Sequence, residues 1–255
     1  TTMSYLLIFL LSFGVSAEAK SKKPAPKAKQ EAAPAEKPAE KSPEKPATEI
    51  YKADVFDLEG KVPYFTFEGD RTYKADRMIY NARFKDMEGN VAAEEKAEIV
   101  KGEITHFESE RFTTREKGIV ETRDGKIFFT YIEKGNKSTK WENLQPDTVV
   151  SANFGPFLES HWDDLMAKKE VKFMYVVWYR QETIRFKFEW NSENDSEVVF
   201  TMNPTNAFYR ALVNPLYITY DKKMRRMVSI KGRTLPKVKK DNAWRDFDAF
   251  IKYHY

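Results

Sequence analysis

An alternation of apolar and polar residues dominates the chain from residue 49 to residue 255. It is clearest at 183–190, where every second residue is apolar: Ile184, Phe186, Phe188 and Trp190. Side chains of a strand point alternately to its two faces, so these four residues share one face. The pattern predicts antiparallel β-structure, with further strands at 63–68, 73–84, 97–108, 111–121, 126–133, 171–179, 197–202, 216–221, 226–232 and 249–255.

Two short segments show helical spacing instead. In 156–167 the apolar residues fall on one face at helical spacing, and a Gly-Pro pair favours a helix that begins at Pro156. The second segment is 205–213, which ends just before another proline. Both segments are too short to be stable alone, so we expect each to pack an apolar face on the sheet.

These elements predict a mainly β protein of the α+β type. A wide antiparallel sheet hides its apolar face by pairing with another sheet, by closing into a barrel or by wrapping around helices. The helical segments favour a large curved antiparallel sheet, or an incomplete β-barrel, with two or more short helices packed on its concave face. The interior is then either a filled aromatic core or a cavity for a lipid-like ligand, and the sequence leaves both open.

The first nineteen residues have the features of a signal peptide. Residues 5–15 form an apolar run of eleven, and Ala17-Glu18-Ala19 fits a small-residue cleavage site, although no Lys or Arg precedes the run. A membrane span needs about 20 apolar residues. We therefore expect cleavage of 1–19 and a periplasmic or secreted protein. The alternative is an inner-membrane anchor through residues 5–15.

Residues 20–48 consist mostly of Lys, Ala, Pro and Glu, with no aromatic residue and no aliphatic residue larger than Ala. Such a segment buries too little apolar surface to offset the entropy lost on ordering. It predicts a disordered tether and leaves 49–255 as a single β-rich domain.

The charge of the chain is +4, and much of the excess lies in the tether. The balanced domain argues against a nucleic-acid partner, since phosphate contacts need a strongly basic face. One exception is 222–240, which holds nine basic residues and no acid. It is either a solvated hairpin balanced by acids elsewhere or a contact for anionic lipid headgroups or an acidic partner. The headgroup candidates are Arg225, Arg226 and Arg233.

Catalytic and metal-binding signals are weak. The chain has no Cys and three widely spaced His residues, which excludes disulfides, thiol catalysis and a zinc-binding helix. Four ionisable residues cluster on the first predicted helix: Glu159, His161, Asp163 and Asp164. They suit acid–base hydrolysis, but their spacing is equally that of a solvated helix face. We expect no catalytic residue, no metal site and no cofactor.

The layout of 51–255 carries a resemblance to a known family. Its features are the strand-rich meander, the helix after Gly155-Pro156, the Met202-Asn203-Pro204 sequence before a second short helix, and the stretch 217–233. This layout resembles uncharacterised bacterial periplasmic proteins that are similar to the lipoprotein carriers and receptors of the LolA/LolB type. The resemblance implies an incomplete β-barrel whose helices cover a hydrophobic cavity for acyl chains, and hence a periplasmic binder of hydrophobic ligands.

Three classes of function follow. The first is an exported, non-enzymatic binder or carrier of a lipid or acyl chain in the bacterial envelope. The second is an envelope-tethered interaction module without a ligand cavity, which would contact an envelope protein or the membrane surface. The third is an enzyme with an unrecognised site. For the first class, we expect the cavity wall on the inward faces of the first helix and of strand 183–190: Leu158, Trp162, Leu165, Ile184, Phe186, Phe188 and Trp190.

Overall fold

The computed structural model describes residues 47–255, so the predicted signal peptide and nearly all of the predicted tether lie outside the described residues. Within 47–255 the chain forms one sheet of fifteen strands and three short helices. The predicted mainly β class is therefore confirmed. Across this part of the chain, no helix is both long enough and apolar enough to cross a membrane.

The first eight strands form a meander of antiparallel hairpins. The Asp124-Gly125 turn has left-handed φ angles of 52° and 68°, as the predicted Asp-Gly hairpin requires. The strands are β1 (Thr48–Phe56), β2 (Pro63–Lys74), β3 (Arg77–Asp86), β4 (Val91–Val100), β5 (Glu103–Arg111), β6 (Glu116–Arg123), β7 (Lys126–Glu133) and β8 (Asn136–Asn143).

The second half of the sheet returns alongside the first. Its last strand pairs with β1, which joins the halves into one sheet, and β8 and β9 are the unjoined end strands, so the sheet stays open. The elements are β9 (Thr148–Val149), α1 (Ser151–Ser160), α2 (Trp162–Met166), β10 (Val171–Val177), β11 (Glu182–Glu193), β12 (Glu197–Pro204), α3 (Ala207–Leu212), β13 (Leu216–Asp221), β14 (Arg226–Lys240) and β15 (Ala243–His254).

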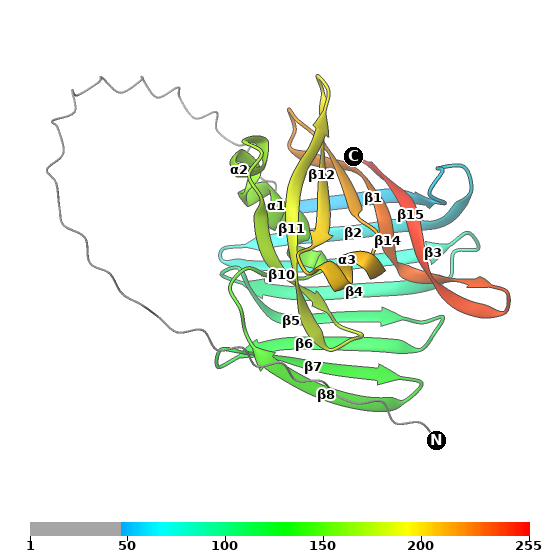
Figure 1. Cartoon of the computed structure of the whole chain (residues 1–255). Helices are drawn as coiled ribbons and strands as arrows, with labels where there is room; N and C mark the ends of the chain where they lie inside the picture. Colours follow the sequence, from blue (N-terminus) through cyan, green and yellow to red (C-terminus); the bar gives the residue numbers. More distant parts are fainter. Residues whose placement is uncertain (1–46) are drawn as a thin grey trace, which may run out of the picture. The chain divides into compact units, whose positions relative to one another are not determined.

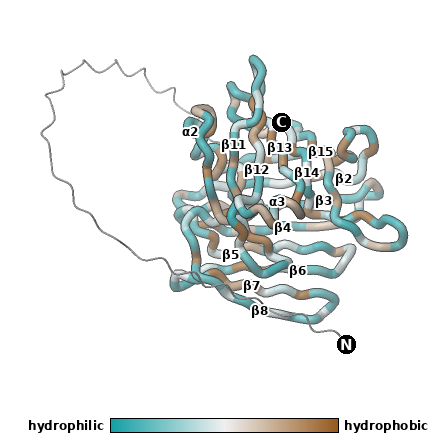
Figure 2. The backbone as a smooth tube through the Cα atoms, in the orientation of Figure 1, coloured by the Kyte–Doolittle hydropathy of each residue, from teal (hydrophilic) through white to brown (hydrophobic). Residues whose placement is uncertain are grey.

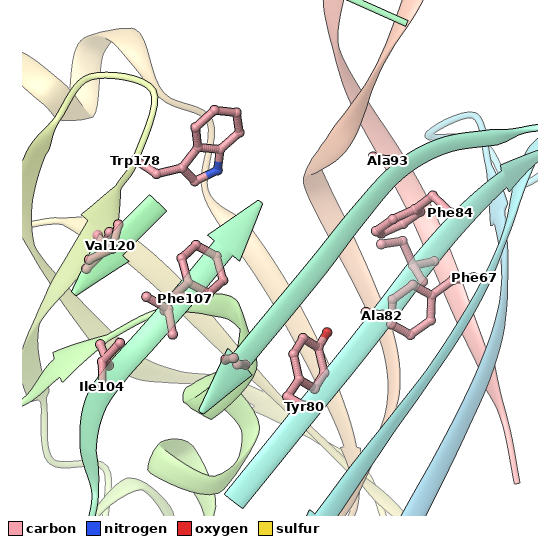
Figure 3. Packing of buried hydrophobic residues seen from close by; sticks show 14 of the residues in the cluster. Phe67, Tyr80, Ala82, Phe84, Ala93, Ile104, Phe107, Val120 and Trp178 are labelled. Carbon is pink, nitrogen blue, oxygen red and sulfur yellow. The ribbon is translucent and has the colours of Figure 1, made fainter. Parts of the chain in front are cut away.

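The open sheet is curved so that its two halves cross. Figure 1 shows β10–β12 running across the direction of β4–β7, with α1 and α2 beside them. One apolar cluster joins the inner face of β1–β7 to residues of the second half, including Trp178. Figure 3 shows Trp178, from the second half, together with Phe107 and Val120 of the first half in this cluster. The other cluster packs α1 and α2 against β10–β13.

The alternation that predicted the strands corresponds to burial. Hydrophilic and hydrophobic positions alternate along the strands in Figure 2. In β3, for example, the buried residues are Met78, Tyr80, Ala82 and Phe84, and the residues between them are more exposed. One face of the strand therefore supplies the core and the other faces solvent.

Three predicted strands, 73–84, 97–108 and 111–121, each contain a turn in the structure. The turns include Ala75, Lys101 and Arg115, which have φ angles of 52°, 53° and 57°. Left-handed backbone is usually marked in a sequence by Gly or Asn, and these three residues carry no such mark. Strands β1, β8 and β9 were not predicted. Nearly every residue of β8 is exposed, so its sequence has no apolar alternation to detect.

Helix α1 begins five residues before the predicted start, and Pro156 lies inside it. A proline within a helix removes the N–H that would bond to the carbonyl four residues earlier, here that of Ala152. Arg71 of β2 supplies the missing donor, because its Nε bonds to that carbonyl oxygen at 2.9 Å. The predicted 156–167 helix also breaks at His161 into α1 and α2. The predicted helix at 205–213 corresponds to α3.

Candidate ligand pocket

A partly open pocket of about 330 Å³ lies between α1 and the ends of β2, β3 and β4. We call it the α1 pocket. Its apolar lining comes from two sources: Met78 and Ile99 from the sheet, and Pro156 and Phe157 from the helix. Met78 and Ile99 are buried members of the sheet core, so this wall is part of the packed structure.

Two adjacent turns form the outer side of the α1 pocket. They join β2 to β3 and β4 to β5, and the N–H of Lys101 donates to the carbonyl of Asp76 across them at 2.7 Å. Gly102 has a φ of 83° and lines the pocket. A side chain there meets no neighbour within 4 Å, so the backbone conformation is the feature that favours glycine.

The charged residues of the α1 pocket already have partners. Arg77 forms an ion pair with Glu98, with Nε and Oε1 3.1 Å apart. Asp76 lies 4.0 Å from the Lys101 ammonium. Asn153 accepts a hydrogen bond from the N–H of Val150 through Oδ1, at 2.8 Å. Its Nδ2 group remains as a donor for which the described residues contain no partner.

A polar network beneath α1 adjoins the pocket through Tyr73. The hydroxyl of Tyr73 donates to Glu49 at 3.1 Å, and Glu49 also accepts from the hydroxyl of Tyr51. Arg71 donates to Tyr51 through Nη1 at 2.5 Å and lies over its ring. Burial, followed by the charge of Glu49, raises the pKa of Tyr73. The network joins β1 and β2 to the start of α1.

A buried carboxyl group holds the N-terminus of α1 on the sheet. Glu95 of β4 is 7% exposed and accepts hydrogen bonds from the hydroxyls of Ser151 and Ser109, at 2.6 and 3.2 Å. Burial raises the pKa of Glu95 to about 7, against the opposing effects of the two serines and of Arg111. None of the three residues lines the α1 pocket, and we assign this group to the attachment of α1.

The seven predicted cavity residues lie together, in the second apolar cluster. Six of them are buried, and Trp190 is partly buried against the same cluster. Phe188 is fully buried and stacks on Phe173 at a centroid distance of 4.5 Å, with Phe154 at 5.1 Å. None of the seven lines the α1 pocket. The predicted inward face therefore packs on helix side chains as expected, but it is a core surface and not the wall of this pocket.

Phe157 connects that core to the α1 pocket. It lines the pocket, and its ring centroid is 5.5 Å from that of Phe173 and 6.4 Å from that of Phe188. The predicted strand face thus supports the pocket from behind, through one aromatic side chain of α1.

The three headgroup candidates do not converge. Arg225 lies over the Trp162 ring at 5.6 Å and within 4.0 Å of Asp163. Arg226 lies over the ring of Tyr255. Arg233 is seven residues further along β14 than Arg226, roughly 23 Å at the rise of a strand. It pairs with two acids, Asp246 and Asp248. The three arginines therefore do not border one site.

Three of the four ionisable residues of the first predicted helix have separate surroundings. The ring nitrogen Nδ1 of His161 lies 2.9 Å from the carbonyl of Phe157. Asp163 is 95% exposed at its side chain, and Asp164 pairs with Lys169 at 2.8 Å. In residues 47–255, no group of three His, Asp or Glu residues is arranged to hold a metal ion.

The sequence did not indicate the sheet side of the pocket. Met78 and Ile99 alternate like any core residue, and Ala75 and Lys101 carry no turn signal. The pocket depends on long-range contacts, since it forms only where α1 lies across two turns. The one clue in the sequence was Gly102, because glycine is a residue type common in turns.

Two comparisons with known proteins found no match. No model of a protein family matches the chain. No curated protein matches it in sequence. The resemblance to LolA/LolB-type proteins therefore stays a prediction from layout, and function must be inferred from the structure itself.

Proposed function

We propose that this chain is an exported, non-enzymatic binder or carrier of a lipid-like hydrophobic ligand in the bacterial envelope. The observation that carries the proposal is the α1 pocket, whose apolar lining includes Met78, Ile99, Pro156 and Phe157. An apolar recess with few polar groups is the usual form of a small-molecule site. The apolar run at 5–15 and the small residues that follow it support export.

The size of the α1 pocket limits the ligand. Ligand sites generally measure about 300–1,000 Å³, and the pocket, at about 330 Å³, is at the lower end. One acyl chain, or part of one, is the occupant that such a volume suits. A lipid with several chains would have to leave most of its apolar surface in contact with water.

The polar groups of the pocket suggest which end of the ligand enters. Arg77 and Asp76 are paired with Glu98 and Lys101, so their charges are already compensated. The amide Nδ2 of Asn153 is a neutral donor beside the apolar wall. We infer a ligand with one hydrogen-bond acceptor, such as an ester or carboxyl carbonyl, at the end of an apolar chain.

An interaction module without a ligand is the second candidate, and the open edge at β8 favours it. Nearly all of Asn136–Asn143 is exposed, including Trp141. An edge strand presents unpaired N–H and C=O groups to which another extended chain can add. Lys137 and Lys140 lie on this strand, and edge lysines also serve to prevent such pairing. The α1 pocket therefore remains the stronger basis for a function.

Native mass spectrometry of protein purified from the bacterial envelope tests the proposal. We expect a folded charge-state distribution with an adduct of single-chain lipid mass, which dissociates on collisional activation. Ser160 lines the pocket and is exposed, so the Ser160→Trp variant should lack the adduct. Folded wild-type protein without any lipid adduct contradicts the proposal. A co-purified protein in place of lipid favours the interaction module.

A further inference from the structure

Three walls of the α1 pocket differ in their chemistry. Met78 and Ile99 form the wall that belongs to the sheet. Tyr73 forms a second wall, and Glu49 accepts a hydrogen bond from its hydroxyl. Phe157 of α1 forms the third, and aromatic residues of the second apolar cluster lie behind it. The chemistry of these walls decides in which direction an apolar chain can extend.

The sheet wall is held by hydrogen bonds on both sides. Met78 lies on β3, which pairs with β2 and β4, and Ile99 lies on β4, which pairs with β3 and β5. Both side chains are buried members of the apolar cluster of β1–β7. Neither can turn away from the pocket without leaving a space in a close-packed core, which is unfavourable. This wall therefore does not open for a longer chain.

The wall at Tyr73 leads to charged groups. The carboxylate of Glu49 accepts from the Tyr73 hydroxyl at 3.1 Å and lies 3.7 Å from the guanidinium of Arg71. Both charged side chains are largely buried, Arg71 more so than Glu49. A hydrocarbon chain inserted here would separate these charges from their partners, and an unpaired charge in a buried position is costly. An apolar ligand therefore does not extend past Tyr73.

The wall at Phe157 has aromatic rings behind it. Its ring centroid lies 5.5 Å from that of Phe173 and 6.4 Å from that of Phe188, and both of these residues are buried. Phe157 itself is only partly buried, and it lines the pocket. One aromatic side chain thus separates the pocket from the core, and removal of its ring leaves an apolar space that continues the pocket.

We propose that Phe157 closes the α1 pocket on its core side and sets the greatest length of apolar chain that the pocket accepts. This inference rests on the proposed function, since it concerns the ligand of the same pocket. The ligand is then a single apolar chain of limited length, whose end lies against the Phe157 ring. A longer chain leaves its additional methylene groups in water, where they contribute no binding free energy.

The dependence of affinity on chain length tests this role of Phe157. The full chain is titrated calorimetrically with octanoate, decanoate, dodecanoate and tetradecanoate, each below the concentration at which it forms micelles. In the wild type, two further methylene groups should raise the affinity roughly tenfold until the pocket is filled, and longer chains should then gain nothing. Phe157→Ala joins the space of the ring to the pocket, so the gain should continue to a longer chain. Phe157→Leu, which keeps more of the packing, should shift the limit in the same direction.

The matched control is Ser160→Ala, on the same helix and in the pocket lining but exposed to solvent. This variant should keep the length limit of the wild type. Thermal melting of each variant checks that the fold is retained. The role of Phe157 is overturned if affinity rises equally through the series in all proteins, or if the wild type and both Phe157 variants share one limit. Failure of every chain to bind the folded wild type contradicts the proposed function itself.

Discussion

The Nε atom of Arg71 donates a 2.9 Å hydrogen bond to the carbonyl of Ala152, the carbonyl that Pro156 leaves without its helical partner. A residue of β2 thereby completes a helix that lies 81 positions away in the sequence. The same helix supplies Pro156 and Phe157 to the pocket. The position of the pocket wall thus depends on a contact between the sheet and the backbone of α1.

This relationship predicts coupling between Arg71 and Pro156. Arg71→Met should destabilise the domain by about 1–3 kcal/mol, since a buried carbonyl loses its donor. Pro156→Ala should recover part of this loss, because alanine has an N–H for Ala152. Urea denaturation of both single variants and the double variant measures the coupling. Additive effects, within about 0.5 kcal/mol, contradict the assignment.

Glu95 predicts a dependence of stability on pH. Its folded pKa of about 7 exceeds the ordinary glutamate value of 4.5, so the folded protein holds this proton more tightly than the unfolded chain. The resulting stability is complete below about pH 4.5 and is lost as the pH rises through 7. The loss is on the order of 3 kcal/mol. Glu95→Gln should flatten this dependence, as followed by urea denaturation between pH 5 and 8.

The matched control for Glu95 is Glu103→Gln, at an exposed glutamate in the next strand. This variant should keep the pH dependence of the wild type. If Glu95→Gln and the wild type lose stability in parallel as the pH rises, Glu95 does not hold a raised pKa and the buried position is wrong.

A second buried network joins the two halves of the sheet. Glu116 accepts from Lys237 of β14 and from Tyr131, at 3.0 Å each, and pairs with Arg111. Arg111 in turn donates to the carbonyl of Leu235 at 2.8 Å. Glu116→Ala leaves a buried guanidinium without its acid, so we expect a loss of about 3–5 kcal/mol in unfolding free energy.

A more exposed glutamate in the same region provides the comparison for Glu116. Glu110 pairs with Lys117 at 3.4 Å, and both side chains are about one-third exposed. Glu110→Ala should cost no more than about 1 kcal/mol. Equal losses at the two positions in chemical denaturation argue against a buried connection between the halves.

Phe188 tests whether the predicted cavity face is a packed core. Its side chain is fully buried between Phe154 and Phe173. Phe188→Ala should therefore lower the unfolding free energy by about 3–5 kcal/mol, the full cost of a core phenylalanine. Phe112→Ala, at a 42% exposed position, is the control and should cost much less. A small loss at Phe188 indicates a roomy interior and restores the original cavity hypothesis.

The sequence predicted the parts of the fold that depend on local pattern. The apolar alternation at Ile184, Phe186 and Phe188 lies in strand β11. Its apolar face packs against α1 and α2, as expected. The Asp124-Gly125 hairpin is likewise confirmed. Turns at Ala75 and Lys101 were missed because these residues have no preference for left-handed backbone, and the surrounding sheet imposes it.

Long-range contacts account for the errors at the site. Pro156 favours a helix start on local grounds, but Arg71 compensates its missing N–H and lets α1 begin at Ser151. The pairing of the basic stretch with acids is equally invisible in the sequence. Lys237 and its partner Glu116, for example, lie 121 positions apart. The site therefore followed from tertiary contacts and not from periodicity.

Titration with dansyl-labelled undecanoic acid tests the central claim, that the α1 pocket binds an apolar chain. The wild type should show saturable binding at one site. Ser160→Trp fills the pocket and should weaken binding by about tenfold or more. Ser192→Trp, the same change at an exposed serine of β11 outside the pocket, should bind like the wild type. Absence of saturable binding by folded wild-type protein, or unaltered binding by Ser160→Trp, contradicts the account.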